Sequence, residues 1–457
     1  MLPTLPNSDK SVTAAVIGTG HFATAVVTQA AAIPQLHVPV VVDLNVAAAQ
    51  RAYARAGIDP ATVAVCESRV AALVALEQRQ RVILTDATLL WELPIDVVLE
   101  STGVPEAGAS HAVAAIDHGK HIVMVSKETD GIVGPILAER ARRAGVVYTP
   151  VDGDQHGLLI ALVEWARVLG LEVICGGKAR DAEFVYDPAA GTVTCGQHTT
   201  TPTVDAWSYF NAIQPGHAAA VVAARREALA ALPQVAGYDL VELAIAANTT
   251  GLLPDIPATH TPALHIAEMP EVFCSEAEGG ILSQPGVIDC VTCLRQPHEA
   301  GLGGGVFIVV ACTNDYSRHI LHTKGLIPNS RGTAAVIYRP YHLCGVETPL
   351  SVLRAGLQGV GISQALPQPR VDVVAQTQRA MRSGETLGSD HSPDLLALMM
   401  PAQAVRPAHR LPLHMGNGNA LQHDLQSHEL IGVADVVEPA HSTLWQLRRE
   451  QDAHFGL

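Results

Sequence analysis

The chain has 457 residues, of which 48% are hydrophobic, and a formal net charge of −15 at pH 7. This length and apolar content predict a globular protein of two to four domains. The thinly spread basic residues argue against nucleic acid and anionic membranes as partners and favour a small molecule. The N-terminal MLPTLPNSDK lacks the charged and apolar parts of a secretory signal, and no apolar run reaches the length of a membrane helix. We therefore expect a cytoplasmic protein.

The first 150 residues alternate short apolar runs with Ala-rich helical stretches. The apolar runs are nearly continuous in Val, Ile and Leu, which is typical of strands covered on both faces. These runs predict strands at 14–18, 38–43, 96–102, 121–126 and 145–151. Strands that alternate with helices predict β-α-β units and a doubly wound parallel sheet, so the fold class is α/β with an N-terminal Rossmann domain.

The residue composition and pattern of the sequence change near residue 152 and again near residue 366. A strand is predicted at 304–313 and a helix at 238–252, ending at Gly251. We expect three domains, a Rossmann domain (1–151), an α+β domain (152–365) whose last helix returns to the Rossmann domain, and a small β-rich domain (366–457). The last domain contains no compact acid/base constellation in sequence, which predicts a structural or regulatory role for it.

The eight cysteines are scattered, which predicts reduced thiols rather than a disulfide framework. Cys290 and Cys293 have C-x-x-C spacing, but there is no second pair at the spacing of a zinc finger. The segment VIDCVTCL reads equally well as a half-buried strand. We expect no metal site.

The segment VIGTGHFATAV at 16–26 raises the question of whether it binds a dinucleotide or only turns the chain. It follows a predicted strand, precedes a predicted helix, and is followed about 20 residues later by Asp43, which together favour a dinucleotide turn. Asp43 is placed to bind a ribose 2′-hydroxyl, which indicates NAD, with NADP possible. The turn residues expected at the cofactor are Gly18, Thr19, Gly20, His21, Phe22 and Ala23.

Two later loops are expected at the same crevice, because each follows a predicted parallel strand. The first contains Ser101, Thr102 and Gly103, and the second contains Ser126 and Lys127. The Ser and Thr side chains and Gly103 are predicted to contact the cofactor. Lys127 is either a solvated surface charge or a group close to the nicotinamide and a substrate oxygen.

Further candidates for catalysis follow the Rossmann domain. In DGDQHG (152–157), Asp154 can orient a base and His156 can exchange a proton, although His156 can equally be a surface histidine. In GGKARD (176–181), Lys178 is the strongest catalytic candidate, because it follows two glycines at a predicted strand end and can polarise a substrate carbonyl. Arg180 beside it is a candidate for substrate binding.

Read in order, the glycine turn, the TG loop and GKHIVMVSK (119–127) resemble the homoserine dehydrogenase superfamily. The resemblance is closer to its branch with a C-terminal SAF domain, which includes deoxyxylulose phosphate reductoisomerase-like oxidoreductases. It rests on the segments 133–178, 246–252, 338–347, 383–388 and 423–436, among which YRPYHL (338–343) is specific. In YRPYHL, Arg339 and His342 are compatible with anion binding or with a structural lock between domains.

The resemblance implies a Rossmann domain, a substrate and dimerisation domain, an SAF-like tail, a homo-oligomer and NAD(P)-dependent oxidoreductase activity. Two departures stand out. Ser126, Lys127 and Glu128 replace the Asn-Val-Glu usual in the branch, and a family lysine is replaced by Tyr238.

The combined interpretation is an NAD(P)-dependent dehydrogenase or reductoisomerase that acts on a small anionic hydroxy or oxo compound. Homoserine is one candidate substrate, and deoxyxylulose phosphate is another. A protein of a different class, which binds a dinucleotide as a sensor or assembly factor without catalysis, is the alternative.

Overall fold

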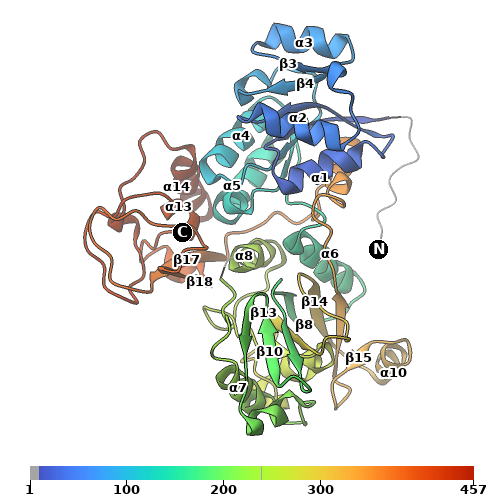
Figure 1. Cartoon of the computed structure of the whole chain (residues 1–457), viewed down its shortest axis with the longest axis vertical. Helices are drawn as coiled ribbons and strands as arrows, with labels where there is room; N and C mark the ends of the chain where they lie inside the picture. The colour runs from blue at the N-terminus through green and yellow to red at the C-terminus, as the bar shows by residue number, and fades with distance from the viewer. Residues whose placement is uncertain (1–9, 238) are drawn as a thin grey trace.

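The structure is a computed structural model that describes residues 10–237 and 239–457, so the N-terminal nine residues and Tyr238 lie outside it. Figure 1 shows a sheet with helices on both faces at the top, a second sheet with helices below it, and a smaller C-terminal part at the side. The predicted fold class is confirmed, since these parts are a parallel, a mixed and a small antiparallel arrangement. No helix in the described part of the chain has the length and hydropathy needed to span a bilayer.

The first sheet is parallel and has the strand order β3-β4-β2-β1-β5-β6-β7. Its strands are β1 Val12–Ile17, β2 Leu36–Val42, β3 Val63–Val65, β4 Arg81–Leu84, β5 Val97–Glu100, β6 His121–Met124 and β7 Tyr148–Thr149. Its helices are α1 His21–Ala30, α2 Val46–Arg55, α3 Arg69–Glu77, α4 Pro105–Asp117 and α5 Lys127–Ala144. Strand β1 pairs with β2 on one side and β5 on the other, so the order reverses at β1, where such sheets bind ligands.

The second sheet has the order β11-β10-β9-β13-β8-β14-β16-β15, with β12 beside β13. Its strands are β8 Val173–Ala179, β9 Phe184–Asp187, β10 Thr192–Cys195, β11 His198–Thr200, β12 Ala263–Leu264, β13 Val287–Arg295, β14 Val306–Ala311, β15 Ile327–Pro328 and β16 Ala334–Arg339. Its helices are α6 Gln155–Val168, α7 Ala218–Ala228, α8 Asp239–Thr250, α9 Met269–Val272 and α10 Asp315–Thr323.

Helix α8 lies where the three parts meet (Figure 1), and it packs against α5, α6 and the C-terminal strand β17 (Val371–Thr377). It is buried along almost its whole length and ends before Gly251, which has a φ of +77°. This confirms the helix predicted at 238–252. A glycine at this position allows the left-handed conformation that ends a helix.

Strand β13 corrects the interpretation of VIDCVTCL. It is buried on both faces through Leu294, not half-buried. Cys290 and Cys293 are three residues apart on this strand, so their side chains point to opposite faces and the pair is unsuited to hold one metal ion. Burial raises the pKa of both thiols, that of Cys293 to about 12.

The chain returns to the Rossmann domain after β16. Helix α11 Pro349–Leu353 and the π-helical turn η6 Arg354–Gln358 place Val352 and Leu353 in the same hydrophobic core as β1 and α1. Asp152 fixes this return by accepting hydrogen bonds from Ser351 (2.9 Å) and Arg354 (3.1 Å). The second sheet is therefore an insertion held at both of its ends.

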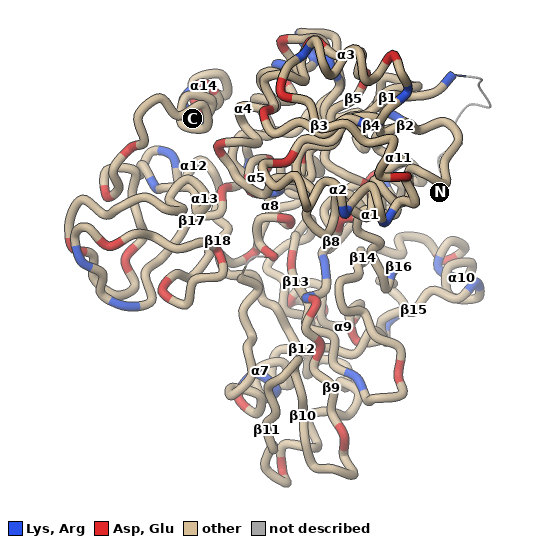
Figure 2. The backbone as a smooth tube through the Cα atoms, turned by 45° about the horizontal axis from the view of Figure 1, so that its top comes forward, with Lys and Arg blue, Asp and Glu red and all other residues tan. Residues whose placement is uncertain are grey.

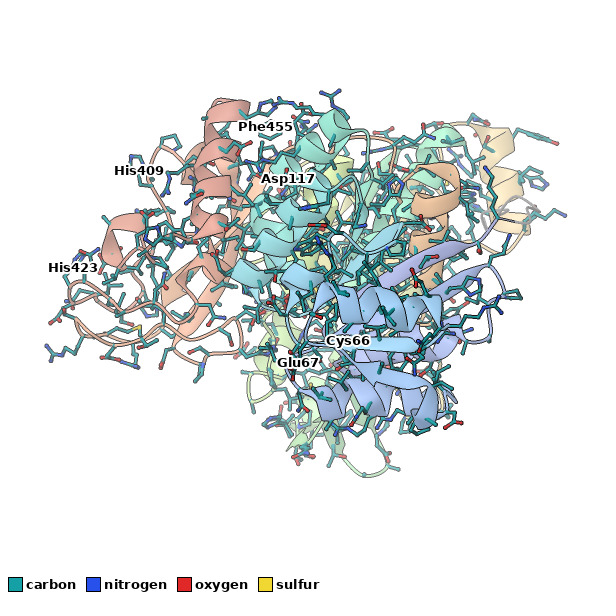
Figure 3. All side chains as sticks on the ribbon, turned by 90° about the horizontal axis from the view of Figure 1, so that it is seen from above. Cys66, Glu67, Asp117, His409, His423 and Phe455 are labelled. Carbon is teal, nitrogen blue, oxygen red and sulfur yellow. The ribbon has the colours of Figure 1, made fainter. Side chains whose placement is uncertain are left out.

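The C-terminal part pairs β17 Val371–Thr377 with β18 Leu395–Pro401. Short antiparallel bridges and the helices α12 Ala402–Val405, α13 Leu413–Gly416 and α14 Thr443–Phe455 complete it. Helix α14 packs on α4 and α5, and Figure 3 shows its end at Phe455 beside the end of α4 at Asp117. Helix α14 therefore joins this part to the Rossmann domain.

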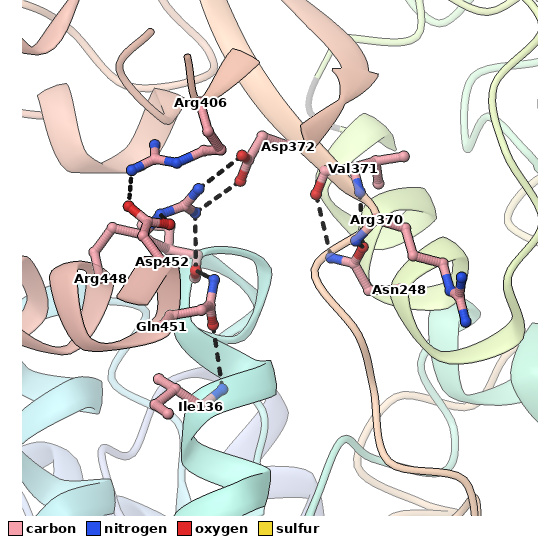
Figure 4. A network of polar contacts seen from close by, with 10 residues as sticks. Ile136, Asn248, Arg370, Val371, Asp372, Arg406, Arg448, Gln451 and Asp452 are labelled. Atoms are coloured by element: carbon pink, nitrogen blue, oxygen red, sulfur yellow. Dashed lines mark hydrogen bonds and ion pairs between the residues drawn. The ribbon is translucent and has the colours of Figure 1, made fainter. Parts of the chain in front are cut away.

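A buried polar network stabilises this contact (Figure 4). Arg448 is 2% exposed, and its guanidinium donates two hydrogen bonds of 2.7 Å to Asp372 and one of 3.1 Å to Asp452. Gln451 donates to the Ile132 carbonyl of α5 (2.9 Å). Asn248 of α8 accepts from the backbone at the start of β17. The C-terminal part is thus tied to both α5 and α8.

Candidate active site

The glycine turn is closed against the loop that follows β5. Gly18 has a φ of +86°, and a Cβ atom at this position would lie 2.8 Å from the Ser101 carbonyl oxygen. No side chain caps α1, whose N-cap is Gly20, so the N–H groups of its first turn are open to a ligand. A tight glycine turn with open N–H groups at a helix start suits a pyrophosphate.

A cleft of about 880 Å³ opens at this turn. Of the predicted cofactor residues, the cleft is lined by Gly18, Thr19, Gly20, Asp43, Ser101 and Thr102. The remaining ones lie outside this lining, and Ala23 is fully buried beneath the turn. Sequence reasoning missed the part of the lining that follows β4, namely Thr85, Asp86, Thr88 and Trp91, because β4 itself was not predicted.

Asp43 is held in place by the turn. Its carboxylate accepts hydrogen bonds from the Thr19 N–H (2.8 Å), from the Thr19 hydroxyl, and from the Asn45 N–H (2.8 Å). A half-buried carboxylate at the end of β2 can still accept a hydrogen bond from a ribose hydroxyl, since each oxygen has two lone pairs. The position of Asp43 is therefore suitable for binding the ribose of an adenine dinucleotide.

The loops after β5 and β6 are joined at the far side of the turn. The Gly103 N–H donates to the Ser126 hydroxyl (2.8 Å), and Ser126 is the N-cap of α5. The fully buried Glu100 accepts from the Thr102 hydroxyl (2.6 Å). These bonds fix the backbone immediately before Lys127, the first residue of α5.

Lys127 is part of a four-residue charged cluster with Lys178, Asp239 and Glu242. One oxygen of Glu242 accepts from Lys127 at 2.6 Å, and the other is bound by Lys178. Lys178 also lies 2.6 Å from Asp239. Figure 2 shows acidic and basic positions interspersed around α8 and β8. Glu242 thus bridges an ammonium group from the Rossmann domain and one from the second sheet.

Burial and charge act in opposite directions on this cluster. Burial alone would raise the pKa of Glu242, but Lys178 and Lys127 lower it to about 2. Burial would lower the pKa of Lys178, but Glu242 and Asp239 raise it above its usual range. Burial raises the pKa of Asp239, and the negative charge of Glu242 adds to this effect. Asp239 is therefore the carboxylate of the cluster that takes up a proton most readily.

The sequence predicts Lys178 at the end of a strand. The structure differs from this expectation. Lys178 is inside β8, 1% exposed, and its ammonium faces α8. The preceding Gly177 allows close packing, because a Cβ atom there would lie 2.2 Å from the Asp289 carbonyl oxygen. Lys127, whose side chain is 20% exposed, is the more accessible ammonium.

Asp154 and His156 also differ from the expected loop. Asp154 caps α6 by accepting from the Gln155 N–H (2.7 Å), and its charge raises the pKa of Lys127, so it faces the cluster. His156 is inside α6 and 1% exposed, which excludes a surface position. Its Nδ1 lies 3.9 Å from Asp154, and neither ring nitrogen has a hydrogen-bond partner among the described residues.

The candidates for substrate binding have partners within the chain. Arg180 donates to the Pro233 carbonyl (2.7 Å) and to Thr292 (3.3 Å). Arg339 pairs with Glu347. His342 is half-buried and packs against Gly304, where a Cβ atom would lie 2.5 Å from its ring. Binding of substrate by these three residues stays a prediction.

The YRPYHLCGVE segment (338–347) reaches the site in a way that the sequence did not reveal. A Cβ atom at Gly345 would lie 2.5 Å from the Phe22 carbonyl oxygen, so the segment packs on the start of α1. Burial, together with the charges of Asp154, Glu242 and Asp181, raises the pKa of Cys344 to about 12. Cys344 therefore lies close to the charged cluster. Sequence reasoning missed Cys344 and the two acidic members of the cluster, Asp239 and Glu242.

The fold and the cleft agree with two family matches, one to an NAD-binding domain and one to an oxidoreductase catalytic domain. Residues 44–148 match the family model of the homoserine dehydrogenase NAD binding domain, and residues 236–348 match that of the oxidoreductase DRL catalytic domain. The predicted resemblance and the NAD(P) cofactor are confirmed. The second match includes α8 and thus Asp239 and Glu242. Both matches end before the C-terminal part, whose SAF identity stays a prediction.

The chain is also similar to two 1-deoxy-D-xylulose 5-phosphate reductoisomerases. That of Heliobacterium modesticaldum is 31% identical over 142 residues, covering 26% of this chain and 35% of the enzyme. That of Idiomarina loihiensis is 33% identical over 73 residues, covering 16% of this chain and 18% of the enzyme. The chain therefore spans about a third or less of the length of these curated relatives.

Among solved structures, GenD2 from gentamicin A biosynthesis in complex with NAD matches with a TM-score of 0.40 and 11% identity, covering 80% of this chain and 92% of GenD2. The WlbA dehydrogenase from Bordetella pertussis, in complex with NADH and UDP-GlcNAcA, matches with a TM-score of 0.28 and 16% identity. That match covers 40% of this chain and 46% of WlbA.

Proposed function

We propose that this protein transfers a hydride between a nicotinamide dinucleotide and a small anionic hydroxy or oxo compound. The observation that carries the proposal is the bridge from Lys127 through Glu242 to Lys178. This bridge begins at the carboxyl end of β6, one loop away from the dinucleotide cleft. Ligands of doubly wound sheets bind outside the carboxyl ends of the strands.

Each residue of the cluster has a part in this chemistry. The bound dinucleotide supplies the hydride acceptor or donor. Lys127 places a positive charge where the substrate oxygen develops negative charge, which lowers the barrier. Glu242 holds that ammonium in one position, and Lys178 in turn holds Glu242. Asp154 and Cys344 complete the wall, and His156, buried inside α6, is one candidate for proton exchange.

Two substrates remain candidates within this proposal. The match to the DRL catalytic domain and the similarity to reductoisomerases favour a phosphorylated sugar such as deoxyxylulose phosphate. The partners of Arg180 and Arg339 within the chain argue against those two side chains as phosphate ligands. Homoserine carries a carboxylate and an amine, which complement the positive and negative side chains of the cluster. Absorbance assays of NADH formation and consumption with both compounds discriminate between them.

A dinucleotide-binding sensor without catalysis is the competing class. It predicts tight dinucleotide binding and no turnover with any hydroxy or oxo acid. The proposal also includes a cytoplasmic homo-oligomer, in keeping with free cysteines that are mostly buried. Light scattering of the purified protein measures its mass in solution.

We expect the protein to bind NADH at least tenfold more tightly than NADPH. Asp43 is fixed by Thr19 and Asn45, so it cannot turn away from a 2′-phosphate without breaking these bonds. Each factor of ten corresponds to about 1.4 kcal/mol. Fluorescence titration gives the dissociation constants of NADH and NADPH. In the Asp43→Asn variant, the ratio of these two constants should move closer to one. Tighter binding of NADPH by the unmodified protein would contradict this assignment.

We expect Lys127→Met to reduce turnover by about two to three orders of magnitude while NADH affinity changes less than threefold. Losing one charge at a developing oxyanion has this size of effect. The matched control is Lys324→Met, which removes the same charge from an exposed position after α10. Equal turnover in the two variants would show that Lys127 does not act on the reacting oxygen.

A further inference from the structure

A second cleft lies between the start of α4 and the C-terminal part. This tail cleft has a volume of about 400 Å³, and its lining includes Val104, Glu106, His414, Ser442 and Leu444. Val104 also lines the dinucleotide cleft. The two clefts therefore adjoin at the loop that follows β5, next to Ser126 and Lys127.

His414 of α13 is a buried polar side chain in the wall of the tail cleft. It is 5% exposed, and neither of its ring nitrogens has a hydrogen-bond partner among the described residues. Its Nε2 lies 3.7 Å from Asp390, beyond hydrogen-bond distance. A buried imidazole without partners is unfavourable unless a water or ligand satisfies it. Asp390 lies on the Nε2 side of the ring, so Nδ1 is the nitrogen left for a water or ligand that enters the wall of the tail cleft.

The charged groups around His414 come from two parts of the protein. Helix α13 packs against α5, which contributes Lys127 and Glu128, while the segment before β18 contributes Asp390 and His391. Burial lowers the pKa of His414 most strongly, Asp390 opposes this, and Lys127 and His391 lower it further. Burial raises the pKa of Glu128 to about 7, with Lys127 opposing and Asp390 and Glu100 adding to the rise.

The acidic residue in the lining of the tail cleft is already engaged in hydrogen bonds. Glu106 accepts from the N–H groups of Thr443 (2.6 Å) and Leu444 (3.2 Å) and from the Ser442 hydroxyl. At neutral pH His414 is uncharged, because its pKa is lowered, and an uncharged imidazole can accept a proton. His414 therefore combines burial, a titratable ring and a place in the wall of a cleft that shares Val104 with the dinucleotide cleft.

We propose that the C-terminal part completes the active site and that its His414 exchanges the proton of the reaction. This inference rests on the proposed function. In the oxidation direction the substrate loses a hydride to the nicotinamide, its O–H bond breaks, and the proton passes to Nδ1 of His414. In the reduction direction the protonated ring returns this proton to the oxygen. Asp390 is a positioning residue that stabilises the protonated ring.

The test measures NAD⁺ and NADH affinity of the full-length protein from pH 8 to pH 5, without a substrate. NAD⁺ carries a positive nicotinamide ring and NADH a neutral one. As the pH falls, Glu128 loses its negative charge near pH 7 and His414 gains a positive charge at lower pH. Each change should weaken NAD⁺ binding about fivefold, as expected for one charge at several ångströms in a partly buried site. NADH binding should change less.

His414→Gln should abolish the decrease in NAD⁺ affinity at lower pH (the lower step), and Glu128→Gln should abolish the decrease near pH 7. The matched control is His423→Gln, which breaks another His–Asp pair of the same part (His423 to Asp435, 2.7 Å) at its exposed outer end (Figure 3). Asp390→Asn keeps the imidazole and should move the lower step to more acidic pH, since the carboxylate favours the charged ring.

Persistence of the lower step in His414→Gln would overturn the inference, as would an equal loss of this step in His423→Gln. Absence of NADH binding at every pH would overturn the proposed function, and the inference with it. Once a substrate is identified, His414→Gln should lower turnover by about 10² to 10⁴-fold, the usual range for a general acid or base. Unchanged turnover in this variant would also refute the assignment.

Discussion

Lys178→Met should destabilise the protein by about 3 to 5 kcal/mol, the usual cost of removing one partner from a buried ion pair. The Lys178 side chain is 2% exposed, and its ammonium is bound by Asp239 and Glu242. Methionine fills the space but leaves two buried carboxylates beside each other. Urea unfolding at pH 7, followed by circular dichroism, measures the loss. The sequence places Lys178 at a predicted strand end as a catalytic candidate, whereas its burial predicts that the fold also depends on it.

The loss should shrink as the pH falls. In the unmodified protein the pKa of Glu242 is lowered to about 2, so its contribution to stability is present above its unfolded value of about 4.3 and is lost as the pH falls toward 2. The double variant Lys178→Met/Glu242→Gln, which removes one stranded charge, should recover part of the stability at pH 7. Unfolding of Lys178→Met at the same urea concentration as the unmodified protein would show that the pair contributes nothing.

Arg448→Met should cost about 3 to 5 kcal/mol and release the C-terminal part from the Rossmann domain. It removes both hydrogen bonds to the buried Asp372, which is 2% exposed, and the bond to Asp452. Helix α14 also loses the Arg448 bond to the Ile132 carbonyl. Limited proteolysis should then cut the chain between the second sheet and β17, where the unmodified protein resists.

The neighbouring Arg449→Met is the control for this variant. Arg449 lies on the same helix but is 58% exposed, and it pairs with a Glu438 that is 48% exposed. Exposed pairs contribute little, so this variant should unfold and be cleaved like the unmodified protein. The docking role of Arg448 is refuted if both variants show the same stability and cleavage pattern.

The Rossmann domain could be predicted from the sequence because its central strands are continuous in Val, Ile and Leu. Strands β5, β6 and β7 fall within the predicted runs, whereas β1 and β2 overlap theirs but begin two residues earlier. Strand β3 was missed because it has only three residues, none of them buried. Strand β4 was missed because its apolar run is limited to Val82, Ile83 and Leu84 after the charged Arg81. The lining of the dinucleotide cleft after β4 was missed for the same reason.

Only half of the charged cluster could be predicted from the sequence. Lys127 and Lys178 were found because each follows an apolar run, but their shared partner Glu242 sits in a helix whose spacing looks like that of an ordinary buried helix. No local pattern in the sequence connects residues 127, 178 and 242. Likewise, His414 and Asp390 belong to different turns of the C-terminal part, and the fold alone brings them to Lys127.

The docking of α14 on α4 and α5 has a consequence for biosynthesis. Helix α5 begins with Lys127 and offers its Ile132 carbonyl and Ile136 N–H to Arg448 and Gln451, which leave the ribosome long after α5. Until they emerge, the Rossmann domain carries an incomplete helical layer. Long-range contacts of this kind slow folding and prolong the exposure of apolar surface to chaperones. A nascent chain arrested before α14 should therefore bind dinucleotide weakly, even though every residue of the glycine turn has already been made.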